Sequence, residues 1–267
     1  MNSKILSKEI RKLSIQMVHS SNASHIGSAL SMVDILAVLY NDIMKFDSSN
    51  PLLEERDKLI LSKGHACVSL YAVLGLKNFF DLGLLKTYGK NGSNFMNHIS
   101  HKVPGVEFST GSLGHGLPYA VGIALAHKIK KNDSKVYVIL GDGEVAEGSN
   151  WEAILFASHN KLDNLVIIVD NNNLQSLTTV DETLSLEPYE EKFLSFGCNV
   201  HRVDGHNHSK LNKVFNDIKF DSKPEVIIAQ TIKGKGVKYM ENRVKWHYKS
   251  PNLKELEIAL KEIENEK

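Results

Sequence analysis

Short apolar runs, each bounded by glycine or polar residues, recur along the chain and indicate the strands of a buried sheet. Their length, their β-branched residues and the flanking glycines are typical of parallel strands covered on both faces. Two runs, 136–140 and 165–169, enclose a segment in which Trp151, Ile154 and Leu155 recur at helical spacing. This order predicts a βαβ unit. The expected strands are 59–61, 136–140, 165–169, 198–203 and 225–230.

Helical periodicity fills much of the chain between these runs. One amphipathic pattern opens the chain, and another, over 209–218, follows the fourth apolar run. The expected helices are 4–19, 31–40, 65–77, 117–130, 147–161, 209–218 and 252–267. Alternating strands and helices predict an α/β fold, a parallel sheet with helices on both faces. No Gly/Ser/Pro-rich linker divides the chain, so we expect a single domain over residues 1–267 with a helical tail at about 252–267.

Composition and charge narrow the class of protein. The chain has 267 residues, 42% hydrophobic and 24% charged, which is enough apolar surface for a sizeable core. A net charge of +1 argues against nucleic acid or a membrane surface as partner. No apolar run reaches membrane-spanning length, and the N-terminus lacks the apolar segment of a signal peptide. Cys67 and Cys198 stand far apart without metal-ligand spacing, so we expect reduced, packed thiols in a cytoplasmic protein.

Polar residues follow two strands of the expected βαβ unit at the points where those strands end. Asp142 follows the first, and Asn172 follows the second. Open α/β sheets bind ligands at the carboxyl ends of their strands. A carboxylate and an amide oxygen placed together there suit Mg²⁺, which completes its shell with water and phosphate oxygens. Gly141 and Gly143 allow backbone N–H groups to approach a phosphate at the helix start, so this segment predicts a metal-bound diphosphate.

The segment 136–175 resembles the thiamine diphosphate signature of the transketolase family. GDGEVAEGSNWEA is similar to that family's GDG-x-x-x-EG-x-x-x-EA, and DNNNLQ supplies the Asn expected after it. The resemblance implies the family's diphosphate-binding fold (PP module), with thiamine diphosphate and Mg²⁺ as cofactors and Ca²⁺ or Mn²⁺ as alternative metals. It implies a set of contacts at the two strand ends: Asp142, Asn172 and Leu174 for the metal, and Gly141, Asp142, Gly143, Glu144, Asn172 and Leu174 for the cofactor. The plain alternative is an ordinary βαβ unit with polar loops.

Three histidines stand in segments that resemble further motifs of this family. SHIGSALSMVDILAVLY resembles the segment with S-G-H-x-G, which implies that His25 faces substrate, although Ile26 replaces the usual Pro. RDKLILSKGHA resembles RD-x-x-x-L-S-x-GH, whose His contacts the diphosphate. His65 stands where a helix begins, so we expect it to be neutral and to donate an N–H to an anion. TIKGKGV followed by Trp-His implies that His247 contacts cofactor or sugar phosphate.

A fourth histidine has two candidates. The family's G-H-P-[DE] precedes P-G-V-E, and this chain reads NHISHKVPGVE, so His98 is the expected match and His101 its rival. Ile99 and Ser100 replace the Pro-acid pair at a place that bears on which sugar is accepted. The resemblance implies a convergence of catalytic rings around the reacting hydroxyls and phosphates, where histidine exchanges protons near neutral pH. The four expected catalytic residues are His25, His65, His98 and His247.

Other segments have weaker or open interpretations. STGSLGHG before the helix 117–130 resembles STG-[SP]-LGQG, which implies that the backbone of Gly111, Ser112 and Leu113 lines the cofactor pocket. Glu147 is either a favourable acid in the first turn of a helix or the family's interface Glu, which links the two cofactor sites of the dimer. His206, in VDGH, is interpreted as a structural loop residue. The lysines of TIKGKGV belong to a solvated loop or to a phosphate rim.

The resemblance covers residues 7–251 and matches the N-terminal half of transketolase. It implies a split enzyme, in which a separate C-terminal subunit supplies the pyrimidine-binding half and the assembly is an α₂β₂ heterotetramer. The implied reaction transfers a two-carbon ketol unit from a ketose, usually phosphorylated, to an aldose. We expect no activity from the chain alone.

Three alternatives remain open from the sequence. The first is another thiamine diphosphate enzyme, such as a 2-oxo acid dehydrogenase subunit or deoxyxylulose phosphate synthase. The second is a transketolase subunit for a specialised sugar. The third is a non-catalytic, degenerate binding subunit, to which the departures at Ile26, Ile99, Ser100 and 176–178 give weight and the retained Asp142 does not.

Overall fold

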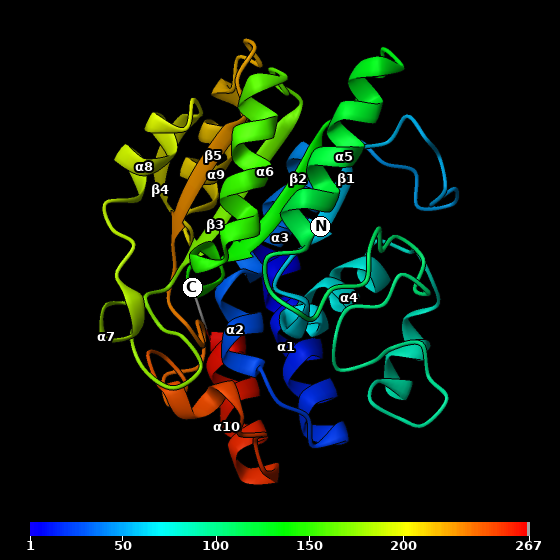
Figure 1. The fold of residues 1–267 in the computed structure, drawn as a ribbon. Helices are drawn as coiled ribbons and strands as arrows, with labels where there is room; N and C mark the ends of the chain where they lie inside the picture. The colour runs from blue at the N-terminus through cyan, green and yellow to red at the C-terminus, as the bar shows by residue number, and fades with distance from the viewer. Residues whose placement is uncertain (266–267) are drawn as a thin grey trace.

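A computed structural model describes residues 1–265 and contains a five-stranded sheet in which every strand is parallel to its neighbours. The strand order is β1–β2–β3–β5–β4 (Figure 1). The strands are β1 (Lys58–Leu61), β2 (Val136–Gly141), β3 (Leu165–Asn171), β4 (Asn199–Asp204) and β5 (Glu225–Gln230). Each expected strand is present, and the expected α/β class is confirmed.

The register of the central strands brings their polar ends together. Gly141 of β2 lies opposite Asp170 of β3, and Asn171 lies opposite Gln230 of β5. Because the strands are parallel, these carboxyl ends share one edge of the sheet, the lower edge in Figure 1. The segments 141–143 and 171–173 therefore leave the sheet side by side.

Side chains of the strands alternate between two hydrophobic cores, one on each face of the sheet. Ile139 and Ile168 are fully buried on one face, and Val138 and Ile167 are fully buried on the other. The first face is covered by α1 (Ser3–Ser21), α2 (Ile26–Ser31), α3 (Val33–Val38), α4 (Cys67–Leu76) and α9 (His208–Asp217), and α10 (Leu253–Asn265) packs on α1. The second is covered by α5 (Gly116–Ile129), α6 (Gly148–His159) and α8 (Tyr189–Ser195). Helices thus cover both faces, as the sequence predicts.

The second helical segment begins earlier than the expected helix over 31–40, because α2 already begins at Ile26. His25 has a left-handed backbone (φ 70°) and donates its N–H to the carbonyl of His247 at 2.7 Å. Ile26 is fully buried. A contact with a residue far along the chain therefore starts this helix, which the local sequence does not reveal.

Several short elements were not expected from the sequence. They include the 3₁₀ turns Leu82–Thr87, Gly143–Ala146 and Val244–His247, the helix α7 (Val180–Leu184) and the helix α8. The expected tail helix is α10, and its last two positions, 266 and 267, lie outside the described residues. Among residues 1–265, no helix combines the length and the apolar character that a membrane crossing requires. Cys67 and Cys198 are buried free thiols.

Candidate active site

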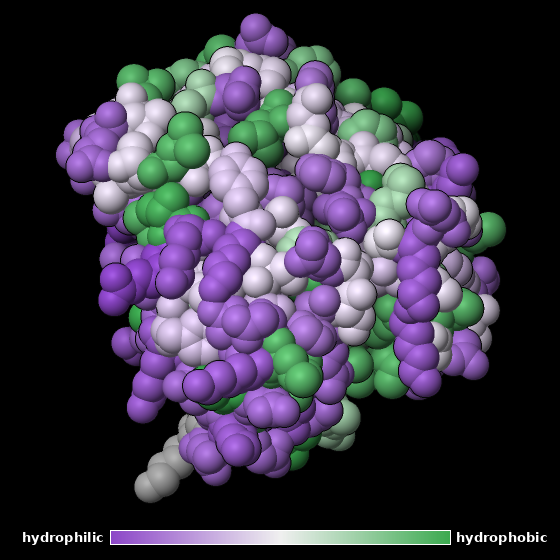
Figure 2. Space-filling model, turned by 90° about the horizontal axis from the view of Figure 1, so that it is seen from below, coloured by the Kyte–Doolittle hydropathy of each residue, from purple (hydrophilic) through white to green (hydrophobic). Residues whose placement is uncertain are grey.

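A cavity of about 290 Å³ lies at the carboxyl ends of the strands and gathers most of the residues singled out from the sequence. Its lining comes from the β2 and β3 ends, the start of α2, the turn after β1 and the segment that precedes α10. Expected residues on its wall are His25, His65, His98, Gly111, Leu113, Gly141, Asp142, Gly143, Glu144, Asn172, Leu174 and His247. Figure 2 shows the molecule from below, a face on which hydrophilic residues predominate and hydrophobic ones form small separate patches.

The expected metal ligands form a set of oxygen donors on this wall. Asp142 is buried, and its two carboxylate oxygens accept N–H groups from Gly143 at 2.9 Å and from Asn173. Asn172 Oδ1 accepts the N–H of Leu174 at 3.2 Å. Each of these oxygens retains a further lone pair, so the set fits a hard cation that takes its remaining ligands from water and phosphate.

Charge near Asp142 also favours a cation. Burial and the neighbouring Asp170 raise the pKa of the Asp142 carboxyl to about 6. A divalent ion beside it would relieve both effects and lower this pKa again. Among residues 1–265, no cluster of three or more His, Cys, Asp or Glu side chains is arranged to hold a metal. A metal here would depend on amide and carbonyl oxygens as well as one carboxylate.

Lys63 lines the cavity and forms an ion pair with Asp170 that the sequence analysis missed. The side chains of Lys63 and Asp170 are 2% and 0% exposed. Burial alone would raise the pKa of Asp170, but Lys63 and hydrogen bonds from Ser31 and Thr231 outweigh it and lower that pKa. Asp170 closes the apolar strand β3, so the signal that could have found the pair was a buried acid that requires a buried cation.

Lys233 places a second cation against the cavity and decides between the two interpretations of its loop. Its Nζ donates to the carbonyls of Leu174 at 3.1 Å and Gln175 at 2.7 Å, and it lies 3.1 Å from His247 Nδ1. Burial lowers the pKa of Lys233 to about 8, against the attraction of Asp142. Lys233 is therefore part of the cavity wall and is not in a solvated loop.

Four histidine rings surround one side of the cavity. The His25 ring centroid lies 5.1 Å from that of His65, 5.6 Å from that of His98 and 5.0 Å from that of His247. Burial, reinforced by neighbouring positive groups, lowers the pKa of His25 to about 4 and that of His247 to about 3. Burial likewise lowers the pKa of His65 and of His98. At neutral pH the four rings are uncharged, and each has one donor and one acceptor nitrogen.

The structure distinguishes His98 from its rival His101. The His98 ring lines the cavity, and its backbone is held by Tyr71, whose hydroxyl donates to the His98 carbonyl at 3.2 Å. His101 is exposed, and its Nδ1 lies 2.7 Å from Ser109 Oγ. The ring of His98, and not that of His101, lines the cavity and contacts the ring of His25.

Glu144 connects three loops that form the cavity wall. Its Oε1 accepts hydrogen bonds from Ser62 Oγ at 2.5 Å and from the Gly114 N–H at 2.9 Å. Its Oε2 accepts from the Gly141 N–H at 3.2 Å. Burial raises the pKa of this carboxyl. Glu144 thus links the turn after β1, the glycine-rich loop and the end of β2 through one side chain.

Two expected cofactor residues lie outside the cavity lining. Ser112 is exposed beside Gly111 and Leu113, which do line the cavity. Glu147 is exposed at the start of α6, where its side chain forms no capping hydrogen bond. Ser112 is expected to contribute its backbone and Glu147 a first-turn or interface contact, so neither prediction requires a side chain that faces the cavity.

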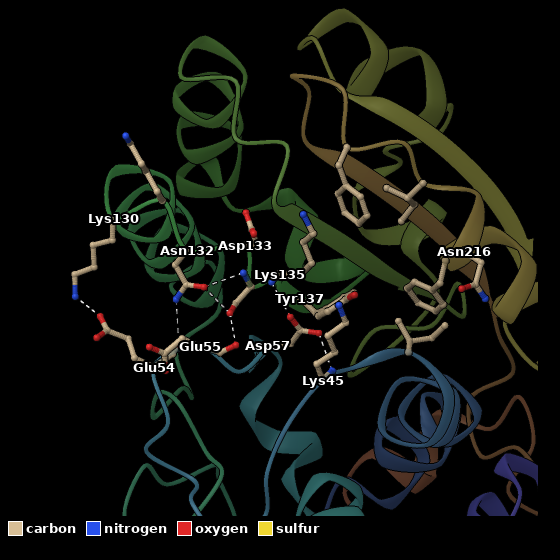
Figure 3. Close-up of a pocket in the computed structure, with 16 residues that line it drawn as sticks. Lys45, Glu54, Glu55, Asp57, Lys130, Asn132, Asp133, Lys135, Tyr137 and Asn216 are labelled. Carbon is tan, nitrogen blue, oxygen red and sulfur yellow. Dashed lines mark hydrogen bonds and ion pairs between the residues drawn. The ribbon is translucent and has the colours of Figure 1, made fainter.

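A larger hollow of about 840 Å³ lies at the opposite, amino-terminal end of the strands (Figure 3). Three of its charged side chains, those of Glu54, Asp57 and Lys130, are bound to one another or to backbone. Glu54 pairs with Lys130, and the Asp57 carboxylate accepts the N–H groups of Lys45 and Lys135, each at 2.8 Å. Size alone therefore does not identify the site, and we take the smaller cavity as the candidate.

Comparisons with known proteins identify the family of this chain. Residues 2–264 match the family described as transketolase, thiamine diphosphate binding domain. The chain belongs to the transketolase family. It is 40% identical to an apulose-4-phosphate transketolase subunit of Phocaeicola vulgatus, over 96% of this chain and 92% of that protein. It is 38% identical to a 6-deoxy-6-sulfo-D-fructose transketolase subunit of a Clostridium species, over 96% and 94%.

Longer transketolases match over less than half of their length. Human transketolase is 37% identical over 95% of this chain and 41% of its own sequence. The crystal structure of Campylobacter jejuni transketolase superposes with a TM-score of 0.93 at 33% identity, over 99% of this chain and 43% of that one. Within the transketolase family, this chain corresponds to the N-terminal, thiamine diphosphate-binding subunit of a split enzyme, which is what its sequence predicts.

Proposed function

We propose that this subunit supplies the diphosphate- and metal-binding half of a transketolase active site that a separate C-terminal subunit completes. The assembled enzyme would transfer a two-carbon ketol unit from a ketose or ketose phosphate to an aldose. The observation that carries the proposal is the joint placement of Asp142, Asn172 and four histidines in one cavity. Leu113 and Tyr248 line this cavity yet are 36% and 58% exposed, which supports a partner that covers them.

The cofactor would be held at the strand ends. Asp142, Asn172 and the Leu174 carbonyl would bind Mg²⁺, with Ca²⁺ or Mn²⁺ as alternatives, and the metal would hold the diphosphate. Gly143 keeps space beside the start of its 3₁₀ turn, because a Cβ there would lie 2.8 Å from Gln175 Cδ. The charge of Lys233 would offset that of the phosphates, and His65 would donate an N–H to a phosphate oxygen. Bound thiamine diphosphate would supply an electron sink for carbon–carbon cleavage.

The histidines would orient the sugar and move its protons. His247 Nδ1 lies within reach of the Lys233 ammonium as an acceptor, which leaves Nε2 to carry the ring proton. A neutral ring of this kind donates to a substrate hydroxyl or to a phosphate oxygen. His25 and His98 complete the same wall and would take and return protons at the reacting hydroxyls.

The second part of the proposal concerns the class of donor sugar. Two relatives that this chain covers almost completely are named for an unusual phosphorylated or sulfonated sugar. We propose a ketose with an anionic end as donor, in a specialised pathway. The enzyme would act in the cytoplasm, where thiols such as Cys67 and Cys198 stay reduced.

The deciding experiment is calorimetric titration of thiamine diphosphate with Mg²⁺ into the single chain and into its complex with the C-terminal subunit. We expect tight, Mg²⁺-dependent binding only in the complex, followed by ketol transfer to an aldose. Ketol transfer by the single chain would contradict the shared site. Absence of cofactor binding in the complex would favour a degenerate binding subunit.

A further inference from the structure

A buried carboxylate behind the cavity joins three segments that are far apart in the sequence. Asp34 of α3 is 4% exposed and pairs with the guanidinium of Arg11 of α1 at 2.5 Å. Its Oδ2 also lies 2.8 Å from His206 Nδ1, and its Oδ1 lies 3.0 Å from His208 Nε2. Burial would raise the pKa of Asp34, but Arg11 and the two histidines hold it well below the usual range. Asp34 therefore stays ionised and organises this cluster.

His206 links Asp34 to the loop that contains Lys233. Its Nε2 accepts the backbone N–H of Ile232 at 2.8 Å. A ring nitrogen that accepts this bond carries no proton, so the ring proton is on Nδ1 and is donated to Asp34. This chain of two hydrogen bonds fixes the residue immediately before Lys233.

The backbone after Lys233 is also linked to Asp34, through Arg11. Arg11 Nε donates to the carbonyl of Lys235 at 3.3 Å, while the N–H of Gly234 donates to the carbonyl of Gly27 at 3.0 Å. Gly234 has φ +83°, a conformation that favours glycine, and its Cβ position would clash with the Met240 carbonyl. The backbone is thus held on both sides of the lysine, and on each side a hydrogen bond leads back to Asp34.

We infer that Asp34 is a positioning residue for Lys233, acting through His206 and Arg11 on the two flanks of the lysine. Lys233 is 1% exposed and its ammonium reaches Leu174 and Gln175 across the cavity wall. A lysine side chain has many rotamers, so its ammonium group stays in one position only if the backbone that carries it is also fixed. The inference rests on the proposed role of Lys233 toward the diphosphate.

Two variants at the same carboxylate separate positioning from simple support. His206→Phe removes the link between Asp34 and Ile232. His208→Phe removes a donor to the same Asp34, but within residues 1–265 the His208 ring has no hydrogen bond to the loop, and its Nδ1 has no partner at all. Asp34→Asn removes the charge of the central carboxylate itself and is compared with these two variants if the protein folds.

The first readout is chemical and needs no cofactor. The single chain is treated with an amine-reactive reagent, and modification of Lys233 is followed by peptide mass spectrometry. We expect His206→Phe to speed modification of Lys233 several-fold, because the ammonium leaves its carbonyl partners, and His208→Phe to leave the rate unchanged. Equal rates in both variants would overturn the inference.

The second readout is cofactor affinity in the assembled enzyme. We expect His206→Phe to raise the Kd for thiamine diphosphate about tenfold with a smaller change in kcat, and His208→Phe to change the Kd less than about twofold, since one hydrogen bond of the frame is lost only in the first. Equal effects would overturn the inference. If the assembled enzyme binds no cofactor at all, the proposed function fails, while the labelling experiment still decides the role of Asp34.

Discussion

At the scale of single residues, burial keeps the four histidines of the cavity in their uncharged forms. The pKa of His25 lies at about 4 and that of His247 at about 3, so both rings are neutral at pH 7. A neutral imidazole can donate and accept at once, which suits a reaction that moves protons between hydroxyl groups. The charged groups nearby, Lys63 and Asp170, are paired with each other.

His98 is the residue whose proposed role is easiest to isolate. We expect His98→Ala to lower kcat about a hundredfold, the lower end of general acid–base contributions, and to change the Kd for thiamine diphosphate less than about twofold. His101→Ala is the matched control, because His101 lies three residues away and outside the cavity. Steady-state kinetics and calorimetry on the assembled enzyme measure both. Weakened cofactor binding with unchanged kcat would contradict the assignment.

The lowered histidine pKa values also predict how stability depends on pH. An unfolded chain protonates its histidines near pH 6.5, whereas folded His25 and His247 resist protonation down to about pH 4 and about pH 3. Their contribution to stability is therefore complete above about pH 6.5 and is lost as pH falls through that window. Thermal melts of the cofactor-free chain should show Tm falling from pH 7 to pH 4. His25→Asn should flatten this slope; a parallel curve would contradict the prediction.

The sequence could identify the site residues that stand in motifs. Asp142, Asn172 and the four histidines stand in recognisable motifs, and the fold brings them together. Lys63 was not identified as a site residue, because it is held there by an ion pair with Asp170, more than a hundred residues away. Glu147 is exposed at the start of α6, so its predicted interface role depends on a partner and stays a prediction.

At the scale of elements, the cavity is built from loop ends held together by buried polar contacts. Glu144 joins the turn after β1, the glycine-rich loop and the end of β2. Such a frame is fixed before any ligand arrives, which lowers the entropic cost of ordering the site. The strands were predictable from short apolar runs, but the start of α2 was not, because it depends on a contact with His247.

Gly143 tests whether space at one loop end matters for binding or for folding. A Cβ there would meet the end of the flexible Gln175 side chain, which can move, so Gly143→Ala should change the free energy of unfolding by less than about 0.5 kcal/mol. It should nevertheless weaken thiamine diphosphate binding at least about tenfold, because the methyl group narrows the place proposed for the diphosphate.

Gly122→Ala is the control for this change. Gly122 lies in α5 with open space around its Cβ position, so we expect about 0.5–1 kcal/mol of added stability and unchanged affinity. Urea unfolding of the single chain and calorimetry on the assembled enzyme provide the two measurements. Equal cofactor affinity in both variants would show that the space beside Gly143 is not used.

At the scale of the whole molecule, the cavity is one wall of a site. The subunit relatives are covered over 92% and 94% of their length, whereas human transketolase is covered over 41%. In the proposed enzyme, another chain supplies the rest of the active site. We expect light scattering of the complex to give the mass of two copies of each subunit, and a mass of one copy of each would contradict the heterotetramer.

The strand order has a consequence for the chain as it is being made. β1 pairs with β2, with Lys58 opposite Val136, so the first strand has no neighbour until the ribosome has synthesised residues far beyond it. Until then the apolar helices α2 to α4 have no sheet to pack against. Nascent chains that stop before Val136 would expose these surfaces, and chaperones that bind apolar segments would find their main target in the first half of this subunit.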